Sequence, residues 1–183
     1  ALVYLRLRGR RLSSVGLARP SLRDGVVVFA GYVLALLAAL GGAVAVSLAG
    51  VEAGTSTSNT SGFSSATSAA WLVPASFLLI GPGEELLFRG VVQGRLRETL
   101  SAPVAVGLAS VVFAAVHFVA LSGSPEARLV TIGILVGPAL VFGTAYELTD
   151  NLVVPSLIHG CYNATLFTLL YATLRFGGGT TAL

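Results

Sequence analysis

The sequence predicts an all-α membrane protein, a polytopic transmembrane helix bundle with about five spans. Of its 183 residues, 55% are hydrophobic and only 10% are charged, and the mean hydropathy is +0.87. This composition is too apolar for a soluble domain. The apolar residues also fall into five runs, each close to the roughly 20 residues that a helix needs to cross the hydrocarbon core of a bilayer.

A basic segment, residues 1–24, precedes the first run. It holds six of the 11 arginines, and the chain contains no lysine. Positive charge beside a span is typical of the cytoplasmic side, so we expect a multi-pass protein of the cell membrane with a cytoplasmic N-terminus. The segment is either a partly helical arm on the membrane surface or a solvated juxtamembrane tail. Because the charge is confined to one end, no nucleic-acid partner is expected; the bilayer itself is the expected environment.

The predicted bundle occupies residues 25–175, and the glycine-rich end, residues 176–183, is predicted to be a flexible tail. Turn-forming, polar or charged stretches separate the apolar runs, and the stretch after the first run is rich in Ser, Thr and Gly. The five predicted spans are residues 26–50, 69–92, 104–121, 129–146 and 152–174.

The second span carries a possible helix break, because Gly81-Pro82-Gly83 lies inside it. Proline in a span frees backbone groups and favours a kink. A polar extension, residues 93–100, follows this span. Ser101 is then expected to cap the third helix, with proline in its first turn.

Glu84 and Glu85 stand in the second span, and the only two histidines, His117 and His159, stand in the third and fifth. Ionisable residues inside a span mark functional sites by default. Glu84 and His117 are equally distant from the boundary between residues 100 and 101. A helical hairpin that turns there would place both about 24 Å from the turn, at the same height.

The spacing within each helix separates the roles of these residues. Glu85 and Arg89 are four positions apart, so they can form an ion pair on one helix face. Glu84 is rotated by about 100° from Glu85, escapes that pairing and is available as a general base. His159 and Asn163 also stand four positions apart, so both can donate to one oxyanion.

Cys161 lies between His159 and Asn163, where a thiol nucleophile could be considered. A residue two positions after His159 faces away from it on a helix. Buried cysteines are usually inert packing groups, so we expect Cys161 to be one. An HExxH sequence is absent, and with it the usual helix of soluble zinc proteases.

Three motifs in this order on successive spans resemble the CAAX-processing and bacteriocin-processing (CPBP) intramembrane protease family, which includes the Ras-converting CAAX endopeptidases. The similarity covers roughly residues 70–170. The motifs are Glu84-Glu85-x-x-x-Arg89, Phe113-x-x-x-His117 and His159-x-x-x-Asn163.

The resemblance implies a residue-by-residue assignment of roles. Glu84 and His117 would activate the attacking water, and His159 with Asn163 would stabilise the tetrahedral oxyanion. Glu85 and Arg89 would support the site. Two cofactor hypotheses stay open: Glu84, His117 and His159 could bind zinc with an open water position, or the same groups could polarise water without a metal.

The leading hypothesis is an intramembrane endopeptidase that acts on a membrane-associated peptide or protein, with prenylated substrates among the candidates. The alternative is a non-catalytic membrane scaffold or immunity-type binding protein that retains the family fold. The presence of all six motif residues argues against a decayed site. A proton-coupled carrier is disfavoured because the sequence shows no recognisable repeat pair.

Overall fold

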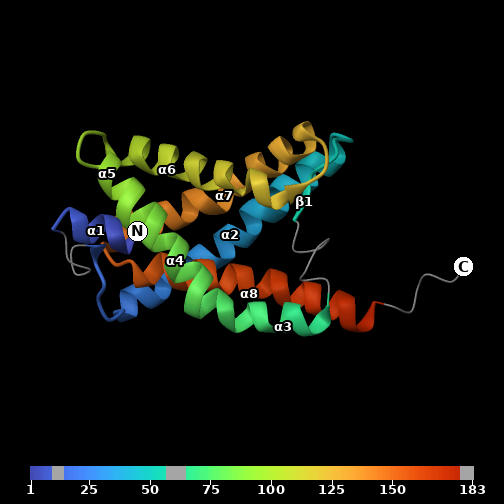
Figure 1. Ribbon diagram of the computed structural model, residues 1–183, viewed down its shortest axis with the longest axis horizontal. Helices are drawn as coiled ribbons and strands as arrows, with labels where there is room; N and C mark the ends of the chain where they lie inside the picture. The colour runs from blue at the N-terminus through green and yellow to red at the C-terminus, as the bar shows by residue number, and fades with distance from the viewer. Residues whose placement is uncertain (10–14, 57–64, 178–183) are drawn as a thin grey trace, which may run out of the picture.

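The computed structural model is an all-α bundle and describes residues 1–9, 15–56 and 65–177 (Figure 1). Five helices of this part of the chain are long and apolar enough to cross a membrane, which confirms a multi-pass membrane protein. They are α2 (Leu22–Leu48), the composite helix Ala66–Leu96, the composite helix Ala102–Ala120, α7 (Pro125–Thr149) and α8 (Val153–Phe176). Residues 178–183 of the predicted tail lie outside the described residues.

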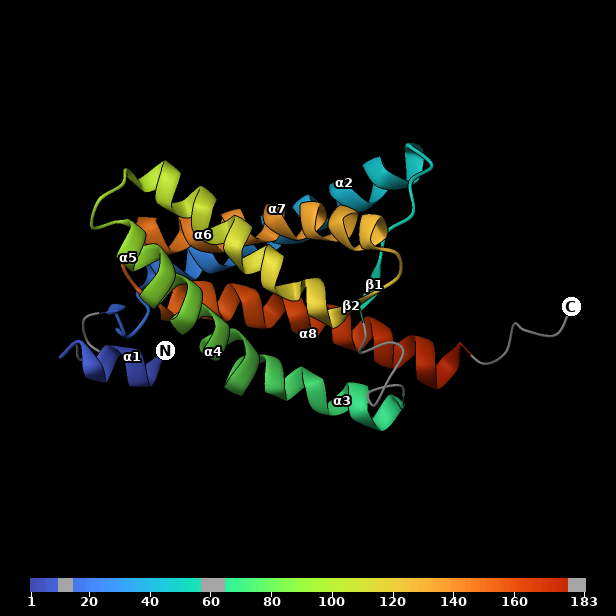
Figure 2. The same ribbon diagram turned by 45° about the horizontal axis from the view of Figure 1, so that its top comes forward.

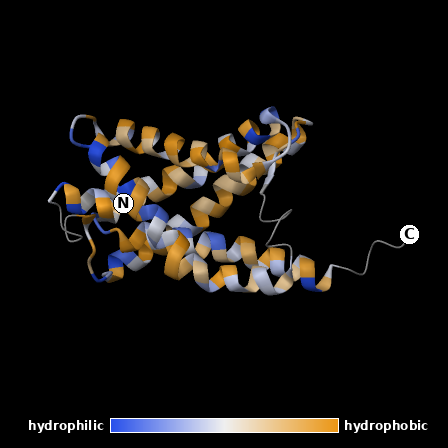
Figure 3. Cartoon of the chain, in the orientation of Figure 1, coloured by the Kyte–Doolittle hydropathy of each residue, from blue (hydrophilic) through white to orange (hydrophobic). Residues whose placement is uncertain are grey.

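One end of the bundle carries α1 (Leu2–Leu7), the turn between α5 (Gly94–Leu96) and α6 (Ala102–Val116), and the turn between α7 and α8. We call it the N-terminal end (Figures 1 and 2). The opposite end carries the loop after α2 and the end of α8. The long helices are mostly hydrophobic along their length (Figure 3). This distribution is the one that a lipid-facing surface requires.

Helix α2 begins at Leu22, four residues before the predicted span, because Ser21 caps it. The Ser21 hydroxyl accepts from the Asp24 amide, and the Asp24 carboxylate accepts from the Ser21 amide at 2.8 Å. This reciprocal capping box satisfies backbone donors that the helix itself leaves unpaired. The cap therefore extends the helix beyond the apolar run.

The second span is one composite helix, not a helix broken at Gly81-Pro82-Gly83. It consists of α3 (Ala66–Ala75), a π-helical segment Ser76–Ile80, α4 (Gly81–Glu85), a second π-helical segment Leu86–Gln93, and α5 (Gly94–Leu96). A π segment widens the helix by one residue per turn and is frequent at functional sites. Both segments flank the two adjacent glutamates.

Gly81 has a packing role in this composite helix. A Cβ atom at Gly81 would lie 2.9 Å from the Ser156 carbonyl oxygen and 3.2 Å from the Gly160 amide nitrogen of α8. A Cβ at Gly160 would in turn lie 2.8 Å from the ring of Phe77. The two glycines therefore let α4 and α8 approach closely, as small residues do between membrane helices.

The third span turns into a different helix type at its histidine. α6 (Ala102–Val116) begins after Ser101 as predicted, although the Ser101 side chain makes no capping hydrogen bond. A 3₁₀ turn, His117–Ala120, continues the span and leads into the short strand β2 (Leu121–Ser122). β2 pairs antiparallel with β1 (Thr55–Ser56), which ties the loop after α2 to the end of the third span.

The N-terminal segment is attached to the bundle at residues 15–18. The Val15 side chain is 2% exposed, and the Gly16 carbonyl oxygen accepts from the Leu152 amide at 2.9 Å. The Asn151 side chain accepts from the Ala18 amide at 3.3 Å. These contacts hold the segment against the turn between α7 and α8, where Asp150 has a positive φ of 49°. Neither sequence-based interpretation of residues 1–24 anticipates this attachment.

Candidate functional site

Glu84, His117 and His159 converge from three different spans. Oε2 of Glu84 lies 3.9 Å from Nε2 of His117 and 3.8 Å from Nε2 of His159. Counting residues from the boundary between residues 100 and 101 predicts that Glu84 and His117 lie at the same height. In the structure, the turn between α5 and α6 brings them to it. His117 therefore faces the bundle interior and not the lipid. Its side chain is 29% exposed and that of Glu84 is 32% exposed, so the protein encloses neither side chain completely.

The orientation of His117 is fixed by its own helix. Nδ1 of His117 lies 2.8 Å from the carbonyl oxygen of Phe113, one turn earlier. A carbonyl oxygen can only accept, so the hydrogen must be on Nδ1. In the neutral ring, Nε2 is then an acceptor directed toward Glu84. Phe113 thus sets the tautomer of His117, in addition to the packing role that the sequence predicts for it.

His159 is almost completely buried and is held on three sides. Its Nδ1 lies 2.7 Å from Oε1 of Glu85. Its ring stacks on Phe142, with centroids 4.8 Å apart and an interplanar angle of 17°. The edge of Phe113 packs against it, with centroids 5.6 Å apart. These contacts leave Nε2 as the only ring nitrogen that is directed toward Glu84.

Glu85 and Arg89 form the ion pair that their spacing predicts. Nη1 of Arg89 lies 3.1 Å from Oε1 of Glu85, and both side chains are fully buried. Nη2 of Arg89 donates to the Ala139 carbonyl oxygen at 2.8 Å. The guanidinium also lies over the rings of Phe113 and Phe142, at 4.8 and 5.5 Å from their centroids. Oε1 of Glu85 therefore accepts from both Arg89 and His159.

A series of polar contacts continues from this ion pair toward the N-terminal end of the bundle. Nε2 of Gln93, a fully buried residue, donates to the Gly143 carbonyl oxygen at 3.1 Å and to Oε1 of Glu147 at 3.0 Å. Nε of Arg97 donates to Oε2 of Glu147 at 3.2 Å. We call the series Glu85, Arg89, Gln93 and Arg97, with Ala139, Gly143 and Glu147 opposite, the polar ladder.

Sequence reasoning did not identify the part of the polar ladder beyond Arg89. A signal was present, because the polar residues at 85, 89, 93 and 97 recur every four positions and so share one helix face. The acceptors at 139 and 143 are backbone carbonyls, which leave no mark in the sequence. Phe142 also was not identified, although its ring supports His159.

Asn163 is the predicted site residue that the structure leaves apart from the others. It lies one turn after His159 on α8 and is partly exposed. Its side chain makes no hydrogen bond with any residue in the described part of the chain. Cys161 is a free cysteine and is also partly exposed.

The candidate metal ligands are Glu84, His117 and His159. Within residues 1–9, 15–56 and 65–177, no group of three His, Cys, Asp or Glu side chains is arranged to hold a metal ion. A metal held by these three residues would also leave the site without a carboxylate base. If Glu84 were a ligand, the other carboxylate, Glu85, would still be engaged by Arg89 and His159, so no carboxylate would remain to take the proton of water.

A buried acceptor stands at the centre of the site. Oε2 of Glu84 is inaccessible to solvent and makes no hydrogen bond within the described residues. Buried polar atoms are nearly always hydrogen-bonded, and exceptions are frequent where a site binds something. The 3.8 and 3.9 Å separations are too long for direct hydrogen bonds. A water molecule or a substrate group that donates to Glu84 would therefore also lie beside Nε2 of both histidines.

Comparison with known proteins assigns a family. The family model "Type II CAAX prenyl endopeptidase Rce1-like" matches residues 66–165, more than half of the chain. These residues hold Glu84, Glu85, Arg89, both histidines and Asn163. Neither a search of curated proteins nor a search of solved structures found a match. The matched segment begins with α3 and includes most of α8, and on this basis the chain belongs to the type II CAAX prenyl endopeptidase Rce1-like family.

Proposed function

We propose that this protein is an intramembrane endopeptidase that hydrolyses a peptide bond in a membrane-associated peptide or protein, with prenylated substrates included. The observation that carries the proposal is the position of Glu84, whose Oε2 lies within 4 Å of Nε2 of both His117 and His159. The family supports peptidase activity in general. The assignment of roles rests on the geometry of the side chains.

The first step is the activation of water by Glu84 and His117. Both groups are acceptors. One water molecule can therefore donate one of its hydrogens to Oε2 of Glu84 and its other hydrogen to Nε2 of His117. The water oxygen attacks the carbonyl carbon of the substrate while Glu84 takes the proton. The C–O bond forms as the carbonyl π bond opens, and the carbonyl oxygen becomes an oxyanion.

The second step requires donors near that oxyanion. His159 can donate from Nε2 when both of its ring nitrogens carry hydrogen, and its Nδ1 contacts Oε1 of Glu85. The Asn163 amide, one turn later, is the proposed second donor. The intermediate then collapses: the C=O bond re-forms, the C–N bond breaks, and the proton held by Glu84 passes to the leaving nitrogen. The products are a carboxylic acid and an amine, and the acid then loses its remaining proton to solvent.

The orientation of the chain is part of the proposal. Six of the 11 arginines fall in residues 1–24. Arg6 on α1 and Arg95 on α5 stand at the N-terminal end of the bundle. We propose that this end faces the cytoplasm, with residues 25–175 as the protease-like bundle in the cell membrane. Cysteine-labelling of sealed vesicles, with Cys161→Ser/Ser101→Cys against Cys161→Ser/Gly50→Cys, tests this: labelling of Gly50→Cys from the cytoplasmic side would contradict it.

The catalytic test is the cleavage of a fluorogenic membrane-peptide library, with and without a prenyl group, by purified protein in proteoliposomes. Glu84→Gln keeps the size of the side chain and removes the base, so kcat should fall about 100- to 10,000-fold. His117→Gln should have a similar effect. Asn163→Ala should lower kcat by about 100-fold if its amide binds the oxyanion.

Cys161→Ser is the matched control, because Cys161 lies between His159 and Asn163 and we assign it no chemistry. Its cleavage rate should stay within about twofold of the unchanged protein. Full activity of Glu84→Gln would refute the proposed base. Loss of activity in Cys161→Ser with an intact fold would point to a thiol nucleophile, and no cleavage of any peptide would favour a binding protein.

A metal requirement is tested separately. Purified protein is analysed for bound zinc, and cleavage is measured before and after treatment with a chelator. Because the proposal routes no step through a metal, we expect the rate to be unchanged by chelation. Loss of activity on chelation and its return with zinc would overturn the metal-free mechanism and leave the peptidase assignment intact.

A further inference from the structure

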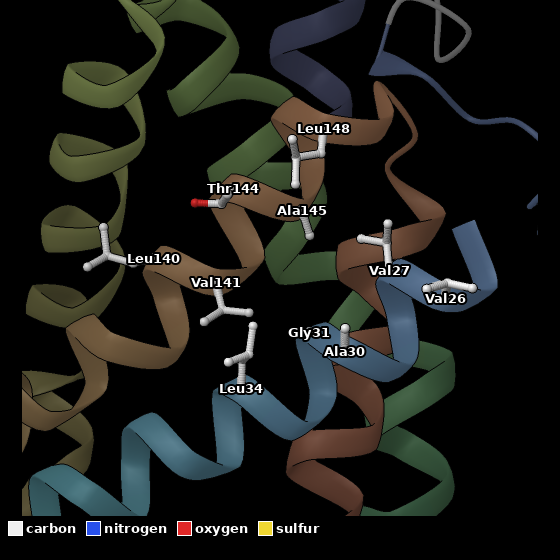
Figure 4. Close-up of a pocket in the computed structure, with 10 residues that line it drawn as sticks. All are labelled: Val26, Val27, Ala30, Gly31, Leu34, Leu140, Val141, Thr144, Ala145 and Leu148. Atoms are coloured by element: carbon white, nitrogen blue, oxygen red, sulfur yellow. The ribbon is translucent and has the colours of Figure 1, made fainter. Parts of the chain in front are cut away.

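An apolar groove of about 340 Å³ lies between α2 and α7, toward the N-terminal end of the bundle (Figure 4). This volume lies within the range of about 300–1,000 Å³ that is typical of ligand pockets. Thr144 is the one hydroxyl-bearing residue in its lining. Val26, Leu34 and Leu148 line the groove and are 68%, 54% and 58% exposed, so the groove is open along its outer side.

The groove lies beside a close contact between α2 and α7 that begins about one turn from the lining residues Leu34 and Leu140. A Cβ atom at Gly137 would lie 3.2 Å from Cβ of Ala38, and one at Gly42 would lie 3.2 Å from the Ile134 side chain. Nearer the N-terminal end, the α2 residue Gly31 packs on Ile158 of α8 instead. The two helices therefore pack closely from Ala38 and Gly137 onward, and the groove lies on the N-terminal side of this contact.

The groove is separate from the candidate catalytic site. Phe142 of α7 stacks on His159 on one side of that helix. Val141, Thr144 and Leu148, which lie on other faces of the same helix, are part of the groove lining (Figure 4). Helix α7 thus stands between the two, and a molecule in the groove enters from the bilayer.

An arginine stands at the polar end of the groove. Arg23 is three residues before Val26 and four before Val27, so it lies on the same face of α2 as these two lining residues, one turn closer to the N-terminal end. It is exposed and interacts electrostatically with the adjacent Asp24, without forming an ion pair within the described part of the chain. The adjacent Asp24 instead accepts from the amide and hydroxyl of Ser21.

We propose that this groove binds an anionic phospholipid, with one acyl chain between α2 and α7 and the phosphate at Arg23. Lipid tails are as apolar as the side chains that line the groove, so moving a chain from the bilayer into it yields no hydrophobic gain. The chain contributes packing, and the charge of the head group decides which lipid binds. An arginine near the membrane surface favours an anionic lipid by about fivefold. The proposal is independent of the peptidase activity.

The test uses tryptophan fluorescence quenched by phospholipids with brominated acyl chains. The sole tryptophan, Trp71, is first replaced in Trp71→Phe, and Leu148→Trp then places a reporter in the groove. Leu169→Trp, on the exposed surface of α8, is the matched control reporter. Each protein is reconstituted in phosphatidylcholine bilayers that contain brominated phosphatidylglycerol or brominated phosphatidylcholine, at increasing fractions.

We expect the groove reporter to prefer phosphatidylglycerol about fivefold and the control reporter to show almost no preference. Arg23→Gln should abolish the preference at the groove, whereas Arg175→Gln, at the opposite end of the bundle, should leave it unchanged. Ala30→Leu partly fills the groove and should reduce quenching by both lipids at Leu148→Trp. Circular dichroism of each variant verifies that the helices are retained.

Four results would overturn the proposal. An equal preference at both reporters would show only bulk charge attraction, and a preference that survives Arg23→Gln would place the phosphate elsewhere. Displacement of the brominated lipid by farnesol, equally well with and without Arg23, would show a site for any apolar chain. Absence of quenching at the groove by either lipid would show that protein, such as a second copy of the chain, covers it.

Discussion

Nδ1 of His159 lies 2.7 Å from Oε1 of Glu85, although the two residues belong to different spans and are 74 positions apart. The same oxygen accepts from Arg89, so Glu85 both neutralises a buried cation and orients the histidine. Glu84, the next residue, faces the other nitrogen of the same ring. Two adjacent glutamates thus contact opposite sides of one imidazole.

The first prediction separates the two roles of Glu85. Glu85→Gln leaves Arg89 without its counter-ion, and removal of one partner of a buried pair lowers the free energy of unfolding by about 3–5 kcal/mol. The double variant Glu85→Leu/Arg89→Leu removes both charges and should be more stable than Glu85→Gln in thermal unfolding. Cleavage should remain low in both because His159 has lost its carboxylate partner. Recovery of cleavage in the double variant would restrict Glu85 to charge neutralisation.

The second prediction compares two glycines of the same motif. Gly81→Ala places a Cβ atom 2.9 Å from the Ser156 carbonyl oxygen, so α4 must move away from α8. Overpacking of this kind costs about 1–3 kcal/mol. Cleavage should fall as Glu85 separates from His159. Gly83→Ala meets no atom within 4 Å and should be neutral or slightly stabilising in unfolding measurements; equal loss in both variants would refute the close-packing argument.

The third prediction concerns Gln93 in the polar ladder. Gln93→Leu leaves the Gly143 carbonyl oxygen and Glu147 without a buried donor, so the free energy of unfolding should fall by about 1–3 kcal/mol. Arg95→Gln is the control, because Arg95 is exposed and pairs with Glu98 in the turn that follows its own helix. Unfolding by sodium dodecyl sulfate in mixed micelles measures both. A similar stability for the two variants would mean that the ladder does not hold α7 in place.

The fourth prediction addresses the attachment of the N-terminal segment. Gly16 has a φ of +70°, and a Cβ atom there would lie 1.9 Å from the Asp150 carbonyl oxygen. Gly16→Ala should therefore release residues 15–18 and expose the Leu152 amide, which hydrogen–deuterium exchange would detect as faster exchange. Gly9 also has a positive φ, but a Cβ atom there would meet no atom within 4 Å. Gly9→Ala should therefore leave the Leu152 amide protected. Unchanged protection in Gly16→Ala would contradict the attachment.

Hydropathy alone predicts the five spans, and counting residues from the α5–α6 turn predicts that Glu84 and His117 lie at the same height. Both work because a helix has a fixed rise and each apolar run has only one way to cross a bilayer. The ends of the helices are less predictable. Ser21 and Ser124 start α2 and α7 earlier than the apolar runs do, because side-chain capping adds polar residues to a helix.

Other features depend on contacts between segments that lie far apart in the sequence. The docking of Val15 depends on the shape of the turn at Asp150 and Asn151, which no local pattern encodes. The role of Gly81 is visible only once α8 is in place, so its sequence context indicated a break where the structure has a close contact. For the same reason, spacing can pair His159 with Asn163 on one helix but cannot show where their side chains point.

The polar ladder constrains chain length as well as stability. Its contacts recur every four residues on two helices at once, from 85 to 97 and from 139 to 147. A one-residue insertion in either segment would rotate all later positions by about 100° and turn a charged or amide side chain toward lipid. Natural insertions and deletions should therefore collect in the connecting loops, and these two segments should keep a constant length wherever the family retains the ladder.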